Sequence, residues 1–236
     1  MRLDKFLCQL NMGSRSDVKN LIRRGQVTVN GVVARTPEQK VDEETDTVVC
    51  QGQTLNYRPH VYYMLNKPKA VVSATRDSHD QTVLDLILPH LPVQDRKREI
   101  VPAGRLDKDT EGLLLLTDDG AVIHQLLSPA KHVDKTYLVE TKSELSEEDI
   151  TALENGVDIG EKKPTLPAKV ERMDERHIRL TIQEGKFHQV KRMLQAVGNE
   201  VLSLKRLTFG PLRLDDNLLP GEFRALTEEE IACLQR

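Results

Sequence analysis

One stretch of the sequence combines an acidic side chain with the surroundings that a catalytic carboxylate needs. Residues 104–120 read GRLDKDTEGLLLLTDDG, with Asp107 just ahead of a run of four leucines. The leucines predict a strand buried on both faces, so the loop leading into it would be held rigidly. Gly104 and Gly112 would let the backbone bend around Asp107, and Arg105 could orient or counter its charge. The chemistry indicated is catalysis by a single carboxylate.

The same stretch also has a plainer interpretation. From spacing alone, Asp107 could be a turn residue, and Asp109 or Asp118 would serve equally well in that role. The whole string, however, resembles the signature of the pseudouridine synthases, and its long form GRLDxDTxGLLLLTxDG is similar to their ribosomal small-subunit branch. This resemblance implies that Asp107 is the catalytic residue. It assigns nothing to Asp109, so Asp109 and Asp118 are expected in turn and capping roles.

A tyrosine in the segment KTYLVE is the second candidate. Strand alternation puts Tyr137 and Val139 on one face, and a tyrosine there could simply belong to the core. The resemblance implies more, because members of the family have an active-site tyrosine in a strand of this kind that stacks on the target base. The Tyr137 hydroxyl could also take the proton from uracil C5.

The segment EGKFHQVKRMLQAVG predicts a helix that packs on the sheet. Helical spacing puts Lys191 at the border of the apolar stripe and Arg192 nearly opposite it. Arg192 would then face solvent or an RNA phosphate, although both residues could be ordinary surface charges. The resemblance implies that Lys191 pairs with the catalytic Asp107. Many relatives have Arg there, and Lys offers a point charge in place of a bidentate fork. The stripe comprises Phe187, Val190, Met193, Leu194 and Val197.

The segment YYMLNKPKAVV resembles the family's first motif and is interpreted as structural. Asn66, Lys67 and Pro68 follow a predicted strand, and Pro68 fixes a turn. Lys67 is expected to add a phosphate contact.

Positive charge is concentrated at the N-terminus. Residues 1–35 contain seven basic and two acidic residues. Apolar spacing predicts one helix from Leu3 to Leu10, and a second helix begins after Ser14 or Ser16 and stops at Gly25. The segment QVTVNGVVA then predicts a hairpin with an Asn-Gly turn.

This order of helix, helix and hairpin resembles the S4 RNA-binding domain over residues 1–58. In the second helix Arg15, Lys19 and Arg23 recur every four residues and would form a ridge facing phosphates, with Arg24 beside it. A solvated basic surface with no partner is the alternative from charge alone. With few aromatic residues, such a domain would recognise phosphates and RNA shape more than base edges.

The remainder of the chain, residues 59–236, is predicted to be a catalytic domain joined by a short linker at residues 56–60. Strands outnumber helices, which indicates an α+β domain with a mixed, mostly antiparallel sheet. Strands are predicted at 61–66, 113–117, 135–140, 168–173, 177–183 and 201–207. Helices are predicted at 82–88, 120–127, 146–154, 187–197 and 227–234, with a charged loop at 94–99.

Composition limits the class of protein. The chain has 236 residues, a net charge of −3 and three separated cysteines, which argues against a disulfide framework or a zinc site. No apolar run approaches the roughly 18 residues of a membrane span, and the N-terminus is unlike a signal peptide. We therefore expect a cytoplasmic monomer without membrane association. No phosphate-binding loop, dinucleotide fingerprint or metal-ligand cluster is present, so no cofactor is expected.

The resemblance implies isomerisation of a specific uridine to pseudouridine in small-subunit ribosomal RNA, free or in an assembly particle. Asp107 could attack C1′, add to uracil C6 or take the C2′ proton, and the sequence does not choose among these routes. Two alternatives stay open. One is a synthase acting on large-subunit RNA, and the other is a non-catalytic RNA-binding factor for ribosome assembly.

Overall fold

The computed structural model describes residues 1–43, 45–55 and 58–236, and it divides into two compact units. The first comprises Met1–Val61 with Leu88–Glu99, and the second comprises Tyr62–Ile87 with Ile100–Arg236. The predicted linker at 56–60 includes residues 56 and 57, which lie outside the described residues. The boundary expected between residues 58 and 59 stays a prediction, and the two units are described separately.

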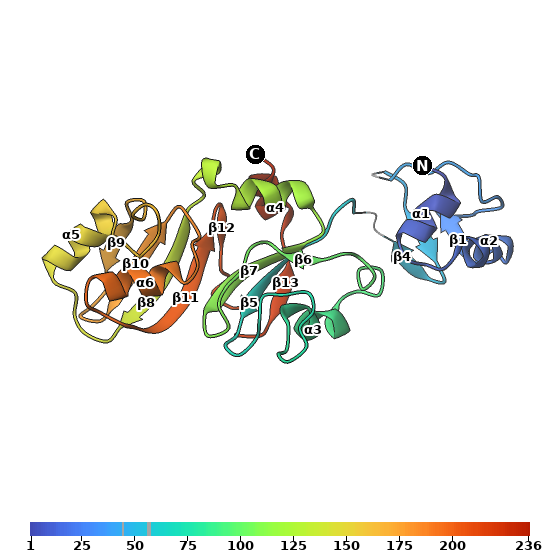
Figure 1. Ribbon diagram of the computed structural model, residues 1–236. Helices are drawn as coiled ribbons and strands as arrows, with labels where there is room; N and C mark the ends of the chain where they lie inside the picture. The colour runs from blue at the N-terminus through green and yellow to red at the C-terminus, as the bar shows by residue number, and fades with distance from the viewer. Residues whose placement is uncertain (44, 56–57) are drawn as a thin grey trace. The chain divides into compact units, whose positions relative to one another are not determined.

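The first unit packs two helices on a small antiparallel sheet (Figure 1). Ser14 caps the second helix through a reciprocal capping box with Asp17, as the sequence predicts. Asn30 and Gly31 both have positive φ, which is the backbone that an Asn-Gly hairpin turn requires. The elements are α1 (Leu3–Gln9), α2 (Arg15–Arg23), β1 (Val27–Val29), β2 (Val32–Val33), β3 (Val48–Cys50) and β4 (Gln53–Leu55).

The second unit is built on one nine-stranded sheet with the path β13-β5-β7-β11-β8-β10-β9, while β6 pairs with β7 and β12 with β11. Among the described strands, only β7 and β11 pair in parallel, so the predicted α+β class with a mostly antiparallel sheet is confirmed. The strands are β5 (Tyr62–Lys67), β6 (Val101–Pro102), β7 (Glu111–Thr117), β8 (Lys135–Thr141), β9 (Lys169–Arg172), β10 (His177–Ile182), β11 (Val201–Phe209), β12 (Leu212–Arg213) and β13 (Phe223–Ala225).

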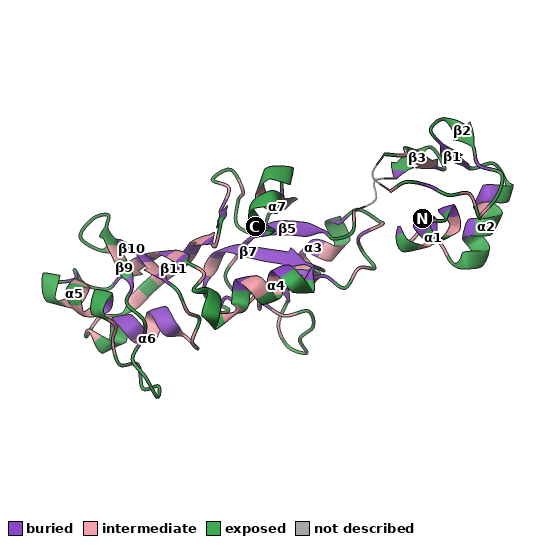
Figure 2. Cartoon of the chain, turned by 90° about the horizontal axis from the view of Figure 1, so that it is seen from above, coloured by how far each residue is buried: buried purple, intermediate pink, exposed green. Residues whose placement is uncertain are grey.

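The leucine run forms the middle of this sheet. All four leucines of β7 are fully buried, and Figure 2 shows β5 and most of β7 in purple. Leu113 and Leu115 join the core that includes residues of α4 (Gly120–Leu127), whereas Leu114 and Leu116 point to the opposite face. A strand buried on both faces fixes the end from which the 104–110 loop emerges.

Helices cover the sheet, and side chains cap the N-termini of three of them. Besides α4, the second unit contains the helices α3 (Val83–Ile87), α5 (Glu147–Asn155), α6 (Gln189–Ala196) and α7 (Glu228–Leu234) and the 3₁₀ turn η2 (Pro129–Lys131). A further 3₁₀ turn, η1 (Leu88–His90), belongs to the first unit. The sequence predicts a capping role for Asp118, but the neighbouring Asp119 is the residue whose side chain accepts hydrogen bonds from backbone amides in the first turn of α4. In Figure 1, α6 lies beside β8, β10 and β11.

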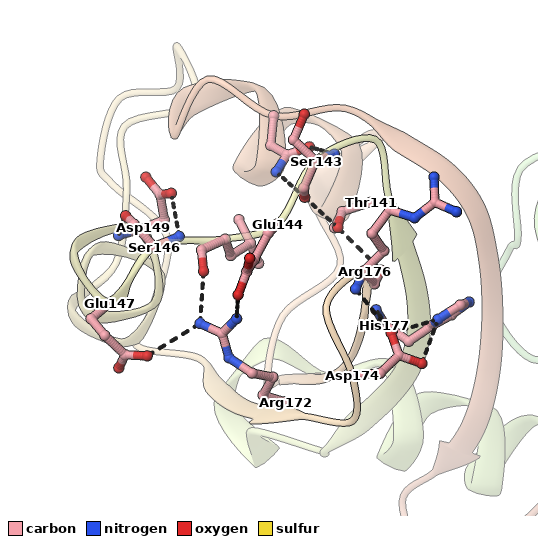
Figure 3. A network of polar contacts seen from close by, with 12 residues as sticks. Thr141, Ser143, Glu144, Ser146, Glu147, Asp149, Arg172, Asp174, Arg176 and His177 are labelled. Carbon is pink, nitrogen blue, oxygen red and sulfur yellow. Dashed lines mark hydrogen bonds and ion pairs between the residues drawn. The ribbon is translucent and has the colours of Figure 1, made fainter.

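A polar network fastens α5 to the sheet, as Figure 3 shows. Arg172 of β9 donates to Glu144 at 2.8 Å, to the Leu145 carbonyl at 2.7 Å and to Glu147 at 3.2 Å. Ser146 caps the helix next to these contacts. The guanidinium therefore holds the turn that leads into α5.

Candidate active site

The loop that carries Asp107 joins β6 to β7 and is tied to a neighbouring loop. The Ser73 hydroxyl donates to the Leu106 carbonyl at 2.8 Å and accepts from the Leu106 amide at 3.0 Å. The Ala70 amide donates to the Lys108 carbonyl at 2.8 Å. Asp107 therefore stands between two backbone positions that are both fixed from outside the loop.

Lys67 is wholly buried beneath this loop. Its Nζ donates to the carbonyls of Pro68, Asp107 and Thr110 at 3.0, 3.0 and 2.8 Å. Burial lowers the pKa of Lys67 to about 8. The phosphate contact expected from the sequence is wrong, because an ammonium with 0% exposure that is already bound to carbonyls cannot reach RNA. Lys67 instead positions the backbone of Asp107.

Lys191 lies between two carboxylates. Its Nζ is 3.1 Å from Asp107 Oδ2 and 2.6 Å from Asp109 Oδ1. The hydrogen bond from Lys191 lowers the pKa of Asp109. Burial acts to lower the pKa of Lys191, but hydrogen bonds to the two carboxylates outweigh it, so that the pKa is raised. The predicted contact with Asp107 is present, whereas the expectation that Asp109 is only a turn residue is wrong.

His188 also faces Asp107, and the sequence analysis missed it. Its Nε2 is 3.6 Å from Asp107 Oδ1. The backbone of His188 has a φ of 49°, in the left-handed region, and it precedes the first turn of α6. The helix therefore begins at Gln189 rather than at the predicted Phe187. The only signal in the sequence was its place three residues before Lys191 in the HQVK segment.

Tyr137 of β8 and a buried arginine form a cross-strand pair. Tyr137 is directly opposite Arg206 of β11, and Arg206 is opposite Gly112 of β7. Burial lowers the pKa of Arg206, and the interaction of the guanidinium with the Tyr137 side chain opposes this effect. Arg206 Nε donates to the Leu113 carbonyl at 2.8 Å, and its guanidinium lies 4.6 Å from the centre of the Phe209 ring. Arg206 thus lies beside Tyr137 on the same face of the sheet.

Two hollows open beside Asp107. The smaller, of about 80 Å³, is lined by Asp107, Tyr137 and Lys191 together. The larger, of about 590 Å³, is also lined by Asp107 and Tyr137, and its volume falls within the usual range of roughly 300–1,000 Å³ for ligand sites. The three residues predicted as catalytic, which are far apart in the sequence, therefore surround one cavity.

The two arginines expected near the substrate, Arg105 and Arg192, differ in their contacts with protein groups. Arg105 is exposed and lines both hollows, and the structure records no ion pair between it and Asp107 in the described residues. Arg192 is held by protein groups: Nη1 lies 2.9 Å from Glu161 and donates to the Phe187 carbonyl at 3.0 Å, and Nη2 donates to the Ile159 carbonyl. The Arg192 side chain is nevertheless 25% exposed, so its expected contact with an RNA phosphate stays a prediction.

The basic residues predicted to bind RNA in the first unit remain exposed. Within the described part of the chain, none of the four forms an ion pair, which leaves their charges available to an anionic partner. These residues lie on or just after α2: Arg15, Lys19, Arg23 and Arg24.

Two features are absent from the described residues. No helix there is both long and apolar enough to cross a membrane. No group of three or more His, Cys, Asp or Glu side chains is arranged to hold a metal ion in those residues.

Family models match both parts of the chain. The model described as RNA pseudouridylate synthase matches residues 61–196, and the model described as S4 domain matches residues 1–48. These matches agree with the two resemblances found in the sequence.

Full-length relatives are similar as well. An uncharacterized RNA pseudouridine synthase of Bacillus subtilis is 51% identical, covering 99% of this chain and 98% of the relative. The ribosomal small subunit pseudouridine synthase A of Escherichia coli strain K12 is 42% identical, covering 99% of this chain and all of the relative. A crystal structure of a pseudouridylate synthase matches with a TM-score of 0.68 at 38% identity, covering 99% of each chain.

Proposed function

Since the chain belongs to the RNA pseudouridylate synthase family, we propose that it isomerises one uridine of small-subunit ribosomal RNA and that Asp107 is its catalytic carboxylate. The observation that carries the proposal is the meeting of Asp107, Tyr137 and Lys191 around one hollow. The small subunit is favoured as the source of the substrate because relatives 40–44% identical over the full chain are named ribosomal small subunit pseudouridine synthase A.

The reaction breaks the C1′–N1 bond of uridine, turns the uracil and joins C1′ to C5. The C5 proton leaves and N1 gains a proton, so neither water nor a redox partner is consumed. An ionised Asp107 can begin this sequence by attack at C1′, by addition at C6 or by removal of the C2′ proton. Lys191 Nζ, 3.1 Å from Asp107, compensates the negative charge before the substrate arrives.

The target base must leave its stack to reach Asp107. Extrusion costs about a few kcal/mol, least for an unpaired or distorted nucleotide, so a structured RNA with an accessible uridine is the substrate that fits. The Tyr137 ring offers a face on which the base stacks, and the Tyr137 hydroxyl is a candidate acceptor for the C5 proton. We further propose that the protein acts as a cytoplasmic monomer, since its proposed substrate is ribosomal RNA and all three residues come from one chain.

Tritium release from RNA labelled at uridine C5 tests this function, and mapping of the modified position identifies the target. Wild type is expected to release tritium from small-subunit RNA or its assembly particle, and Asp107→Asn to abolish release while still binding RNA. The proposal fails if wild type releases none from ribosomal RNA, or if Asp107→Asn keeps full activity. Release confined to large-subunit RNA would overturn the assignment of the substrate.

A further inference from the structure

An exposed aromatic ring stands at the rim of the larger hollow. Of the four phenylalanines of the chain, Phe6 and Phe209 are buried and Phe223 is half-buried, but Phe187 is 71% exposed. Phe187 lines the same hollow as Asp107. Packing within the unit does not explain a ring left in water beside a catalytic carboxylate, which points to an external partner.

The ring is paired with a second ring and lies nearly parallel to it. The centres of the Phe187 ring and the His188 imidazole are 3.8 Å apart, and their planes differ by 20°. The turn that carries them is fixed: the Lys186 amide donates to Gln189 Oε1 at 2.9 Å, and Arg192 donates to the Phe187 carbonyl at 3.0 Å. The backbone of this pair is therefore positioned before any ligand binds.

We propose that the stacked Phe187 and His188 rings form a platform for the RNA base next to the uridine that enters the active site. The inference rests on the proposed function and extends it to a second nucleotide. A base adjacent to an extruded one loses a stacking neighbour, and an aromatic face replaces that neighbour for any base.

The surroundings identify nucleic acid as the partner. Arg105, Lys108 and Lys186 line the hollow that Phe187 borders, so cations suited to phosphates adjoin a flat apolar face. Tyr137 and Phe187 lie at different depths in the site, which indicates different roles for the two rings. Tyr137 is only 8% exposed and lies on the sheet below, where the target base would enter, while Phe187 stands at the rim.

The absence of tryptophan from the sequence allows a direct optical test. Phe187→Trp in the full chain, combined with Asp107→Asn to prevent turnover, places one tryptophan on the platform. Its fluorescence is expected to be quenched as substrate RNA binds, because the indole stacks on a base. Leu219→Trp in the same background is the control, since Leu219 is 63% exposed and does not line either hollow.

RNAs with an abasic site on the 5′ or the 3′ side of the target uridine locate the stacked base. One of the two is expected to bind without quenching Phe187→Trp. Equal quenching by the intact RNA and by both abasic RNAs would overturn the proposal, as would quenching of Leu219→Trp to the same extent.

Kinetics supply an independent measurement. Phe187→Leu is expected to raise the KM for RNA by about 5- to 100-fold with a much smaller effect on kcat, and Phe187→Tyr to restore most of the loss. An unchanged KM in Phe187→Leu overturns the platform even though wild type is active. A wild type without turnover would instead overturn the proposed function, which the fluorescence of the Asp107→Asn proteins does not test.

Discussion

At the scale of single residues, two lysines organise the surroundings of Asp107 in different ways. Lys67 holds the main chain of Asp107 from below through carbonyl oxygens, and Lys191 contacts its carboxylate from α6. The difference lies in burial: Lys67 is inaccessible, while the Lys191 side chain is 27% exposed at the edge of the hollow. Backbone position and charge are thus controlled by separate groups, which substitutions can distinguish.

Replacing Lys191 should impair chemistry and spare RNA binding. Lys191→Met removes the cation that contacts Asp107, and we expect kcat to fall roughly 10²-fold, the loss typical of removing one electrostatic contact at a reaction centre. Asp109→Asn is the matched control, since it leaves Lys191 in contact with Asp107 alone, and its kcat should change less than about tenfold. Single-turnover rates and RNA affinity measure both effects. Equal losses of rate in the two variants, or a loss of affinity that accounts for the rate, would contradict this role.

The buried charge of Lys67 should appear in the dependence of stability on pH. Its pKa of about 8 in the folded chain lies below its ordinary value of 10.5. Below pH 8 both folded and unfolded chains carry the proton, so the cost of burying the charge is fully present. Between the two values the unfolded chain binds more protons than the folded chain, and stability therefore rises with pH.

The comparison with Lys67→Met isolates this effect from all other titrating groups. From pH 7 to pH 9.5, the free energy of unfolding of wild type is expected to increase by about 2 kcal/mol relative to the variant. Urea denaturation at both pH values measures the difference. A difference that stays constant over this range would show that Lys67 does not release its proton on the alkaline side.

At the scale of elements, the joint between β7 and β11 is the place where the sheet connects the Asp107 loop to Tyr137. Gly112 has a φ of 103°, and a Cβ built on it would lie 2.3 Å from the Arg206 carbonyl oxygen. The two strands approach this closely only because Gly112 has no side chain. The sequence predicts a bend at Gly112, and the close approach of a neighbouring strand is an additional reason for glycine at this position.

Gly112→Ala should therefore destabilise the second unit more than an ordinary substitution. Backbone atoms would have to move apart, and we expect the free energy of unfolding to fall by about 3 kcal/mol or more. Activity should also fall, because Arg206 would move with β11 and displace its cross-strand partner Tyr137 on β8. Gly120→Ala is the control, because position 120 is helical and has open space around it. That variant should be neutral or stabilised by up to about 1 kcal/mol. Urea denaturation of both variants decides, and similar stability of the two would contradict the steric argument.

Periodic elements could be predicted from the sequence, whereas features that depend on distant neighbours could not. The leucines of β7, the stripe of α6 and the alternation of β8 give signals within one segment, so these elements lie within a few residues of their predicted positions. The short strands β6, β12 and β13 have two or three residues and exist only through their partners.

The same limit applies to the site. Motif residues indicated Asp107, Tyr137 and Lys191, and the structure brings them together. The burial of Lys67, and the contact of Asp109 with Lys191, depend on how the 104–110 loop folds back over β5 and toward α6. No spacing along the chain contains that information.

At the scale of the whole molecule, the first unit includes a segment that comes from within the predicted catalytic domain, residues 59–236. Leu88–Glu99 groups with Met1–Val61, and Arg58 Nη2 lies 3.2 Å from Asp95 Oδ2. Arg98 Nη2 donates a hydrogen bond to the Arg58 carbonyl at 2.6 Å. Deleting residues 1–58 would therefore also remove the partners of Leu88–Glu99. Substitution on the surface is a cleaner test of RNA binding than truncation.

Neutralising the ridge on α2 should weaken RNA binding and reduce its dependence on salt. Arg15, Lys19 and Arg23 are exposed and have no ion-pair partner in the described chain, so each could release counterions from an RNA phosphate. The triple substitution to Gln is expected to lower the slope of log affinity against log salt concentration by about 2 to 3, because each phosphate contact contributes about 0.7 to 0.9. Binding titrations with substrate RNA at several salt concentrations measure the slope.

The matched control removes the same charge from arginines that already have carboxylate partners. Arg2, Arg179 and Arg213 are 51%, 43% and 76% exposed, and they pair with Glu38, Glu171 and Asp216. Their replacement by Gln changes net charge equally, so any effect of overall charge appears in both triple variants. If the ridge contacts phosphates, the slope of log affinity against log salt concentration decreases only in the α2 variant. An equal change in the two variants would attribute the salt dependence to net charge, and an unchanged slope in both would remove α2 from the RNA-binding surface.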